Sequence, residues 1–362
     1  MAADFVSRRT LLATFVFMLT LALSISNTHA STIVIHVLES PAIAKNMLGI
    51  SSKRYIQVYL PDGYEEGNQR YPVLYFIPGW AGVAQEGSFF KYYLDDAIRS
   101  AKIPPTIVVS IDVREGIMFL NSPVWGYWED FMISELIPFI DREYRTIPDS
   151  LARGLTGSSF GGYTALILPV RNPDIWGSIG SIDPALWDWE LGSSREDWVD
   201  LLKFLPENLD GYRPFNPRMI PEPIQLATAL SPNPEAPFFC DFPVTPDGQW
   251  IPEIRERFIG YDLSNPETIA KNSKTLKDLL CIVIITPTEG IAIQSSLCAP
   301  LFNQMQEAGI GVIRLDMPGG HNDYYGERFI VIAEHILGAM IGAEVSVSPR
   351  GKVAALWGEI KN

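Results

Sequence analysis

Short β-branched or aromatic runs alternate with longer amphipathic stretches along most of this chain, and no other feature constrains its fold as strongly. Strands that alternate with helices form βαβ units, which build a mostly parallel sheet covered by helices on both faces. The predicted strands are Thr32 to Leu38, Tyr55 to Leu60, Val73 to Ile77, Thr106 to Ile111, Leu151 to Thr156, Trp176 to Ile182, Cys281 to Thr286 and Gly311 to Met317. The predicted helices are Phe89 to Ser100, Trp128 to Ile140, Phe160 to Val170, Ser295 to Ala308 and Glu327 to Ile341. The sequence therefore predicts one α/β domain, in which the first two strands, joined by a loop, form an antiparallel edge.

The alternation breaks between Pro184 and about Lys277, where a long segment separates two predicted strands. Eleven of the 28 prolines in the chain lie between Pro206 and Pro252. A segment this long and rich in proline is not a simple connector. We therefore predict a cap, inserted at about residues 184–277 over the carboxyl ends of the strands; a structural side wall is the alternative. The domain would span residues 31–345, with a C-terminal tail over residues 346–362.

The first thirty residues have the pattern of a signal peptide. Arg8 and Arg9 precede an uncharged apolar run that ends at Ile25, and Thr28 and Ala30 are the small residues of a cleavage site before Ser31. An apolar run of about fifteen residues is short for a bilayer-spanning helix, which favours removal of residues 1–30 over a retained anchor. The paired arginines also fit a twin-arginine signal. We expect an exported protein, periplasmic or extracellular, with no stable membrane span after removal of the signal.

Charge and cysteine content exclude several classes of function. The chain has 42 acidic and 28 basic residues and a formal net charge of −14, so binding to a nucleic-acid backbone is not expected. Export permits disulfides, and Cys240, Cys281 and Cys298 could form one bond in any of three pairings. No Cys-x-x-Cys motif or Cys/His cluster occurs, so we predict no catalytic metal. The sequence does not indicate an oligomeric state.

A candidate nucleophile lies in the segment Gly157-Ser158-Ser159-Phe160-Gly161, which matches the motif Gly-x-Ser-x-Gly. A predicted strand ends just before this segment and a predicted helix begins at Phe160, so Ser159 is expected on a strand-to-helix turn. Small residues on both sides permit the strained backbone that exposes the serine Oγ, and the Phe160 N–H lies where negative charge would develop. The alternative is a glycine-rich turn that only packs a helix on a strand.

A serine hydroxyl needs a histidine base, and His321 is the best candidate. It follows the last predicted strand in the loop Pro318-Gly319-Gly320-His321, where the base belongs if the chain order is serine, acid, histidine. His36 lies in the first predicted strand and His335 inside a predicted helix, so we interpret both as structural.

The triad acid and the oxyanion donors are less well marked. The loop after the Cys281 to Thr286 strand offers Glu289 as the acid. Asp183, at the end of the Trp176 to Ile182 strand, is the alternative, and a third possibility is that no acid functions. For the oxyanion hole, we expect the backbone N–H of Trp80, which lies between Gly79 and Gly82 after the third strand, to act with the Phe160 N–H.

These residues together resemble the Putative esterase family of α/β-hydrolases, which includes S-formylglutathione hydrolases of the esterase D type, feruloyl esterases, siderophore esterases and mycolyltransferases. The resemblance runs from about Ser52 to Ile341. Its carriers are Arg54 to Pro61, Gly63-Tyr64, Tyr71 to Tyr75, Glu135 to Asp141 with Tyr144, Gly157 to Gly162 and Gly319-Gly320-His321.

The resemblance implies the α/β-hydrolase fold and a secreted serine carboxylic-ester hydrolase that forms an acyl-enzyme on Ser159, with His321 as its base and no cofactor. The chain departs from the family at two positions. Similar members carry Gly-Thr-x-Asp after the seventh strand, and this chain has Gly290 at the position of the aspartate. Pro78 precedes the oxyanion glycine, where such folds often have histidine.

Two alternative functions stay open on the sequence. An acyltransferase of the mycolyltransferase type would share the acyl-enzyme, whereas Gly290 in place of aspartate motivates a non-catalytic carbohydrate-binding or surface-binding protein. The expected partner is a small-molecule or carbohydrate ester. If the tryptophans of the predicted cap face the cleft, they would stack on a sugar or aryl group; they are Trp187, Trp189, Trp198 and Trp250.

Overall fold

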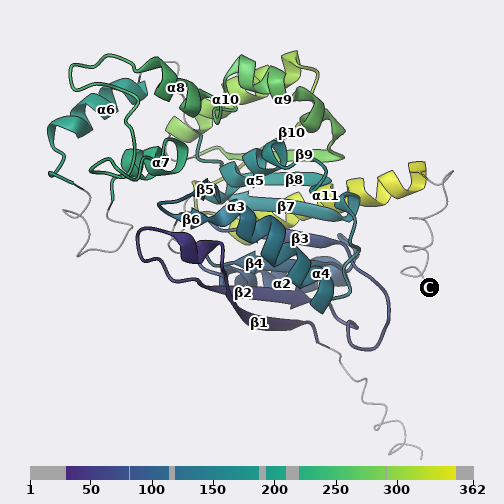
Figure 1. Ribbon diagram of the computed structural model, residues 1–362. Helices are drawn as coiled ribbons and strands as arrows, with labels where there is room; N and C mark the ends of the chain where they lie inside the picture. The colour runs from purple at the N-terminus through teal and green to yellow at the C-terminus, as the bar shows by residue number, and fades with distance from the viewer. Residues whose placement is uncertain are drawn as a thin grey trace, which may run out of the picture.

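The computed structural model describes residues 30–80, 82–113, 119–186, 193–208, 220–289 and 292–347 (Figure 1). Residues 1–29 of the predicted signal peptide and residues 348–362 of the predicted tail lie outside the described residues, as do Trp187 and Trp189. Within the ranges given above, no helix is both long enough and apolar enough to cross a bilayer.

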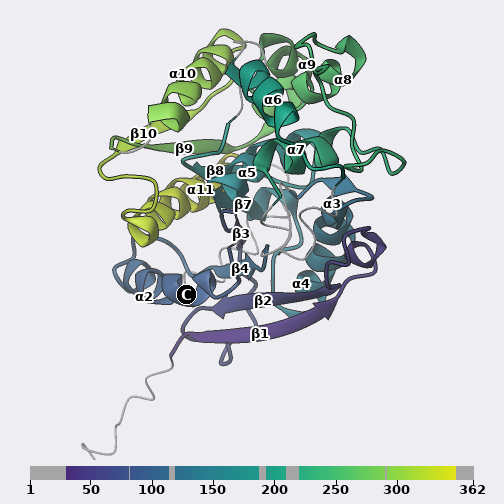
Figure 2. The same cartoon turned by 90° about the vertical axis from the view of Figure 1, so that its left-hand side faces the viewer.

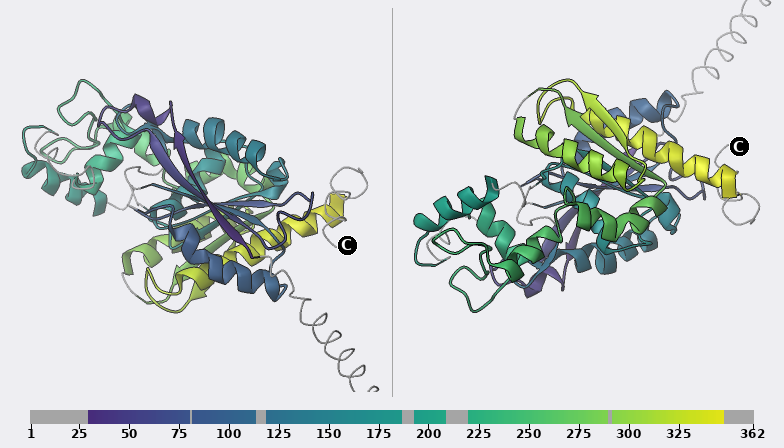
Figure 3. Two further views of the ribbon diagram at one scale, coloured as in Figure 1. Left: turned by 90° about the horizontal axis from the view of Figure 1, so that it is seen from below. Right: turned by 90° about the horizontal axis from the view of Figure 1, so that it is seen from above.

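An eight-stranded sheet forms the centre of the domain, in the order β1-β2-β4-β3-β7-β8-β9-β10. Its strands are β1 (Thr32–Glu39), β2 (Lys53–Leu60), β3 (Val73–Ile77), β4 (Ile107–Ile111), β7 (Arg153–Ser158), β8 (Ser178–Ile182), β9 (Cys281–Pro287) and β10 (Ile313–Met317). All eight correspond to predicted strands. β1 pairs antiparallel with β2, and β2 with β4, while every other neighbouring pair is parallel. The predicted mostly parallel sheet with an antiparallel edge is confirmed. In the view from below in Figure 3, the purple β1 crosses the other strands at an angle, as the twist of a large sheet requires.

Helices cover both faces of this sheet. Along β3, alternate side chains belong to two different hydrophobic clusters, one on each face. Tyr75 and Ile77 belong to one hydrophobic cluster, and Leu74 and Phe76 to the other. The second cluster packs under α2 (Glu86–Arg99) and α11 (Tyr325–Val347), which lie on one side of the sheet in Figure 2. The opposite face carries α3 (Trp128–Asp130), the π-helix η2 (Phe131–Leu136), α4 (Ile137–Glu143) and α5 (Phe160–Arg171). Because both faces are covered, the central strands β3, β4, β7, β8 and β9 are buried along their whole length.

Smaller elements complete the fold. They are the 3-10 helices η1 (Ile43–Lys45) and η3 (Ser150–Ala152), the two-stranded ribbon β5 (Asn121–Ser122) and β6 (Gly126–Tyr127), and α10 (Ala292–Glu307) between β9 and β10. Cys240, Cys281 and Cys298 are all buried as free thiols, so none of the three possible disulfides is formed in this structure.

The described part of the segment between β8 and β9 contains helices joined by loops. Its described elements are α6 (Ser193–Lys203), α7 (Glu222–Leu230), α8 (Pro252–Ile259) and α9 (Pro266–Asp278). It has its own aromatic packing, in which Trp198 is buried against Phe242 and Phe258. One contact brings the segment to the carboxyl end of the sheet: the Trp80 Nε1 donates to the Gln225 Oε1 on α7 at 3.4 Å.

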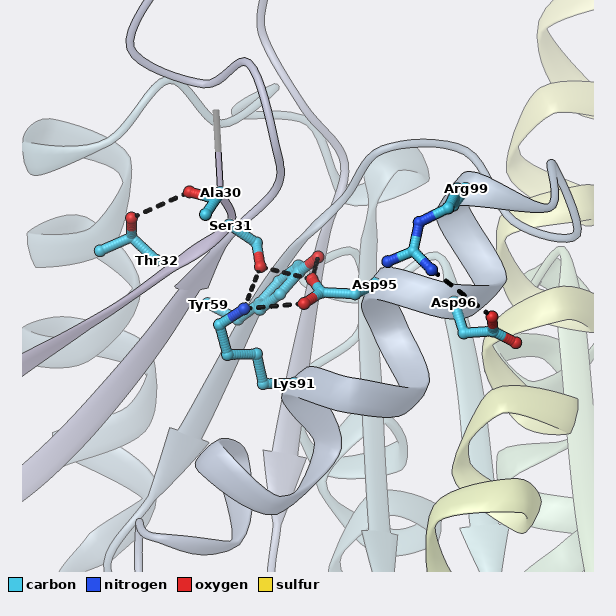
Figure 4. A network of polar contacts seen from close by, with 8 residues as sticks. All are labelled: Ala30, Ser31, Thr32, Tyr59, Lys91, Asp95, Asp96 and Arg99. Carbon is cyan, nitrogen blue, oxygen red and sulfur yellow. Dashed lines mark hydrogen bonds and ion pairs between the residues drawn. The ribbon is translucent and has the colours of Figure 1, made fainter. Parts of the chain in front are cut away.

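A polar network ties the start of β1 to α2 (Figure 4). The carboxylate of Asp95 accepts hydrogen bonds from the Ser31 hydroxyl, from the Tyr59 hydroxyl at 2.9 Å and from the Lys91 ammonium at 2.7 Å. Lys91 also donates to the Ser31 hydroxyl at 2.5 Å. Burial opposes ionisation of Asp95, but the hydrogen bonds from Lys91, Ser31 and Tyr59 outweigh it and lower the pKa of the carboxyl.

Replacement of Asp95 by asparagine is expected to lower the free energy of unfolding by roughly 1 to 3 kcal/mol at neutral pH, because three donors lose a charged acceptor. The pKa of Asp95 is lower in the folded than in the unfolded chain, so this stabilisation is complete above the unfolded pKa and disappears as the pH falls through the folded value. Urea unfolding at several pH values tests this expectation. Asp96→Asn is the matched control, because the one contact of the Asp96 carboxylate within the described part of the chain is an exposed ion pair with Arg99, at 3.8 Å. An equal loss in both variants, or a loss that persists in acid, would contradict the role of Asp95.

Candidate active site

Ser159 occupies the junction between β7, which ends at Ser158, and α5, which begins at Phe160. Its backbone has φ +54° and ψ −118°, a conformation that side-chain-bearing residues rarely adopt. Hydrogen bonds hold it there: the Ser159 N–H donates to the Ile182 carbonyl at 2.9 Å, and the Ala185 N–H donates to the Ser159 carbonyl at 3.0 Å. The residue is therefore on the sharp strand-to-helix turn that the sequence motif predicts.

The two glycines of the motif are required by close packing. A Cβ atom at Gly157 would lie 2.2 Å from the Gly161 carbonyl oxygen, and a Cβ at Gly161 would lie 2.0 Å from the Ile77 carbonyl oxygen. Both distances are far below van der Waals contact, so α5 can begin directly beside the end of β3 only if these residues have no side chain. This packing brings the loop after β3 next to the serine.

His321 lies in the loop after β10, and its ring Nδ1 hydrogen-bonds to a carboxylate oxygen of Asp183. Asp183 directly follows β8, is 1% exposed and has a positive φ of 42°. Its N–H donates to the Ile285 carbonyl on β9 at 2.8 Å, which fixes the turn that aims its side chain. A carboxylate on Nδ1 is the arrangement that leaves the other ring nitrogen, Nε2, to act as a base.

The structure places the alternative acid, Asp183, beside His321, and not the expected Glu289. Thr288 and Glu289 are exposed, and the Glu289 backbone N–H donates to the Gly319 carbonyl at 3.0 Å. Among the described residues, the Glu289 side chain makes no hydrogen bond or ion pair. Chain order placed the acid after β9, but β8 is the neighbour of β9 in the sheet. Both strands therefore end at the same edge, and an acid on either can face the histidine loop.

The two segments that carry the expected oxyanion donors, Trp80 and Phe160, meet at Ser159. Phe160 is the first residue of α5, so its N–H is at the helix N-terminus. Gly79 lies over the serine, since a Cβ built on it would be 3.3 Å from the Ser159 Cβ. A turn closed by the Gly82 N–H on the Gly79 carbonyl at 2.9 Å then carries Trp80, whose N–H has no acceptor within the described part of the chain. That N–H and the Phe160 N–H come from segments that meet at Ser159.

One cavity of about 580 Å³ brings Ser159 and His321 together. Aromatic side chains of Trp80, Phe89 and Tyr325 line it. So does Glu86, the first residue of α2, whose carboxylate accepts the Tyr325 hydroxyl at 2.6 Å. Burial raises the pKa of the Glu86 carboxyl, against the hydrogen bonds from Tyr325 and Val83 that lower it. The cavity thus combines a hydroxyl, an imidazole, aromatic walls and a polar acceptor.

Of the tryptophans in the predicted cap, Trp198 and Trp250 do not line the cavity, and Trp187 and Trp189 lie outside the described residues. None of the described residues that line the cavity comes from the inserted segment. Trp198 is 1% exposed inside that segment, and Trp250 packs against the same hydrophobic cluster. The Arg255 guanidinium lies 5.3 Å from the centroid of the Trp250 ring. The aromatic residues of the cavity come instead from α2, α11 and the loop after β3. Phe89 and Tyr325 lie on helices with the spacing of core residues, so the sequence carried no signal for these two.

The other two described histidines lie elsewhere, as expected. His36 on β1 shares a 2.5 Å hydrogen bond with the Tyr144 hydroxyl and packs edge-on against Phe139. His335 lies within α11. Neither lines the cavity.

This chain is similar in sequence to known esterases. The profile of the family described as "Putative esterase" matches residues 49–210. The chain is 34% identical over 135 residues to an endo-1,4-beta-xylanase/feruloyl esterase of Xylanibacter ruminicola, a match that covers 34% of this chain and 18% of the relative. It is 33% identical over 116 residues to esterase Rv1288 of Mycobacterium tuberculosis, covering 31% of this chain and 25% of the relative. The chain thus spans a quarter or less of the length of these relatives.

Solved structures share the architecture over most of the chain. A ferulic acid esterase superposes with a TM-score of 0.59 at 19% identity, covering 86% of this chain and 99% of that chain. An S-formylglutathione hydrolase from Staphylococcus aureus superposes with a TM-score of 0.52 at 12% identity, covering 85% of this chain and 99% of that chain. The predicted α/β-hydrolase fold is confirmed.

Proposed function

We propose that this chain, which is similar to the Putative esterase family and has the α/β-hydrolase fold, is a carboxylic-ester hydrolase that works through an acyl-enzyme on Ser159. The observation that carries the proposal is one cavity lined by a serine on a strained strand-to-helix turn and by a histidine whose Nδ1 is held by a buried carboxylate. Sequence similarity to esterases supports it.

The mechanism follows from these groups. The Ser159 Oγ attacks the ester carbonyl carbon while the His321 Nε2 takes its proton, and the Asp183 carboxylate keeps the proton on Nδ1 and stabilises the imidazolium. The N–H groups of Phe160 and Trp80 bind the oxyanion of the tetrahedral intermediate. Collapse of that intermediate expels the alcohol, which receives the proton from His321. Water then attacks the acyl-enzyme by the same route and releases the acid.

Asp183 also bears on the non-catalytic alternative. That alternative rests on Gly290, which stands where similar proteins have the acid. Because Asp183 on the neighbouring strand reaches His321, the histidine does not lack a carboxylate partner. This contact favours catalysis over a binding role. Transfer of the acyl group to another alcohol stays the alternative fate of the acyl-enzyme, and the partition of products between water and an added alcohol distinguishes the two.

The walls of the cavity suggest the class of ester. Trp80, Phe89 and Tyr325 offer flat apolar surfaces on which an aryl ring could stack, and Glu86 offers an acceptor for a hydroxyl group. Two of the proteins compared above are named as feruloyl or ferulic acid esterases. We therefore propose that the natural substrate is a small-molecule or carbohydrate ester of an aromatic acid. We also propose that the protein is exported, a proposal that the N-terminal sequence of protein recovered outside the cytoplasm would test.

A side-by-side assay of methyl ferulate, p-nitrophenyl acetate and p-nitrophenyl palmitate tests both the proposed ester hydrolysis and the proposed substrate class. We expect hydrolysis of the first two, and kcat/KM for the aromatic ester at least about tenfold above that for the long-chain ester, since a pocket of this size discriminates by fit. A preference for palmitate would overturn the substrate class. A folded protein that hydrolyses none of the three esters and is not labelled by a fluorophosphonate would refute the proposed ester hydrolase activity.

A further inference from the structure

Arg328 is a fully buried side chain that the mechanism above does not use. It lies in the first turn of α11, with 0% of its surface exposed. Its guanidinium donates to the Pro318 carbonyl at 2.7 Å and to the Gly320 carbonyl at 2.8 Å, and a longer contact of 3.4 Å reaches the His321 carbonyl. A single side chain thus holds the backbone of the loop that carries the proposed base.

No carboxylate forms an ion pair with Arg328 within the described ranges, although burying an unpaired cation is costly. Burial lowers the pKa of the guanidinium, and Asp183 is the strongest of the groups that oppose this shift, ahead of Asp323 and Glu327. Asp183 is itself 1% exposed, and its Oδ1 has no hydrogen-bond partner among the residues that the structure describes. Arg328 and Asp183 thus both contact His321, Arg328 at the backbone carbonyl and Asp183 at the ring, and these two buried, oppositely charged side chains form no ion pair with each other.

We propose that Arg328 is a positioning residue for His321, which fixes the histidine loop through its carbonyls and balances the buried negative charge of Asp183. This inference rests on the proposed function. Fork-shaped donation to two carbonyls needs the planar guanidinium, whereas the charge balance needs only a cation. The two roles can therefore be separated by substitution.

The charge has a consequence for proton transfer. When His321 takes the proton from Ser159, a second cation appears beside Arg328, so the guanidinium opposes formation of the imidazolium. Asp183 favours the imidazolium, and Asp323 and Glu327 add negative charge on the side of α11. Among the described residues, Tyr324 on the same loop and Cys298 on α10 are further titratable groups near this site. Without the cation, the acid limb of the pH profile of kcat/KM should move to higher pH.

The experiment compares Arg328→Lys with Arg328→Gln in the full chain. Lysine keeps the charge but loses the fork, so kcat should fall about 10-fold to 100-fold from misplacement of the loop, while the acid limb of the pH profile of kcat/KM stays in place. Glutamine removes the charge, so the acid limb should also move to higher pH by about one unit. Lys102→Gln is the control, because Lys102 pairs with Glu334 on the exposed side of α11 at 3.2 Å. The control should leave both kcat and the acid limb unchanged.

The outcomes separate this inference from the proposed function. An Arg328→Gln variant with an unmoved acid limb would overturn the charge balance, and an Arg328→Lys variant with wild-type kcat would overturn the positioning of the loop. A wild-type protein that neither hydrolyses esters nor reacts with a fluorophosphonate would instead refute the proposed function. If Arg328→Gln does not fold, the double variant with Asp183→Asn provides the test. Charge balance predicts that the double variant folds, because neither buried charge is left without its opposite, and a double variant that also fails to fold would contradict it.

Discussion

Replacement of Ser159 by alanine is expected to abolish ester hydrolysis and labelling by a fluorophosphonate while the protein stays folded. Loss of a triad nucleophile lowers kcat by about 10⁶-fold, because no other group can carry the acyl chain. Alanine keeps the Cβ atom, so the strained backbone at φ +54° and the packing of α5 change little. Steady-state hydrolysis of p-nitrophenyl acetate, intact-mass analysis after labelling and circular dichroism measure the three parts of this expectation.

The neighbouring serine provides the matched control. Ser158 also lines the cavity, but it is the last residue of β7 and not the residue on the turn. Ser158→Ala should therefore still be labelled at one site and keep most of its activity. If Ser159→Ala is labelled and Ser158→Ala is not, the nucleophile has been assigned to the wrong residue.

Replacement of Asp183 by asparagine is expected to lower kcat by about 10²-fold to 10⁴-fold in a protein that still folds. The amide can present its NH₂ group to Nδ1, which favours the tautomer with the proton on Nε2 and leaves His321 unable to accept the proton from Ser159. It also removes the negative charge that stabilises the imidazolium. Measurement of kcat for p-nitrophenyl acetate, with thermal unfolding as the check on the fold, tests this effect.

Glu289→Gln is the comparison that decides between the two acids. The Glu289 side chain is exposed, so this variant should have nearly wild-type kcat. An inactive Glu289→Gln with an active Asp183→Asn would return the acid to the loop after β9. Full activity in both variants would mean that His321 works without a carboxylate, held by the backbone or by water.

The parts of the site that could be predicted from sequence are those that short segments encode. The Gly-x-Ser-x-Gly turn was recognisable because close backbone contacts near Ser159 leave no room for a side chain at Gly157 or Gly161. His321 was recognisable because a glycine loop at the end of the last strand is where a base belongs in this order of elements. The acid was not, because its identity depends on which strand end lies against His321.

The sequence by itself determined the eight strands, their mostly parallel pairing and the turn that presents Ser159. Each of these follows from local periodicity, from burial on both faces or from glycine packing, and all three can be read over short stretches of chain. The tertiary structure decided which carboxylate faces His321, which aromatic residues line the cavity and what Arg328 holds. Asp183 and His321 are separated by 138 residues along the chain, and Glu86 and Tyr325 by 239. Such pairs form only because the order of strands in the sheet brings their loops to one edge, and a spacing along the chain does not encode that order.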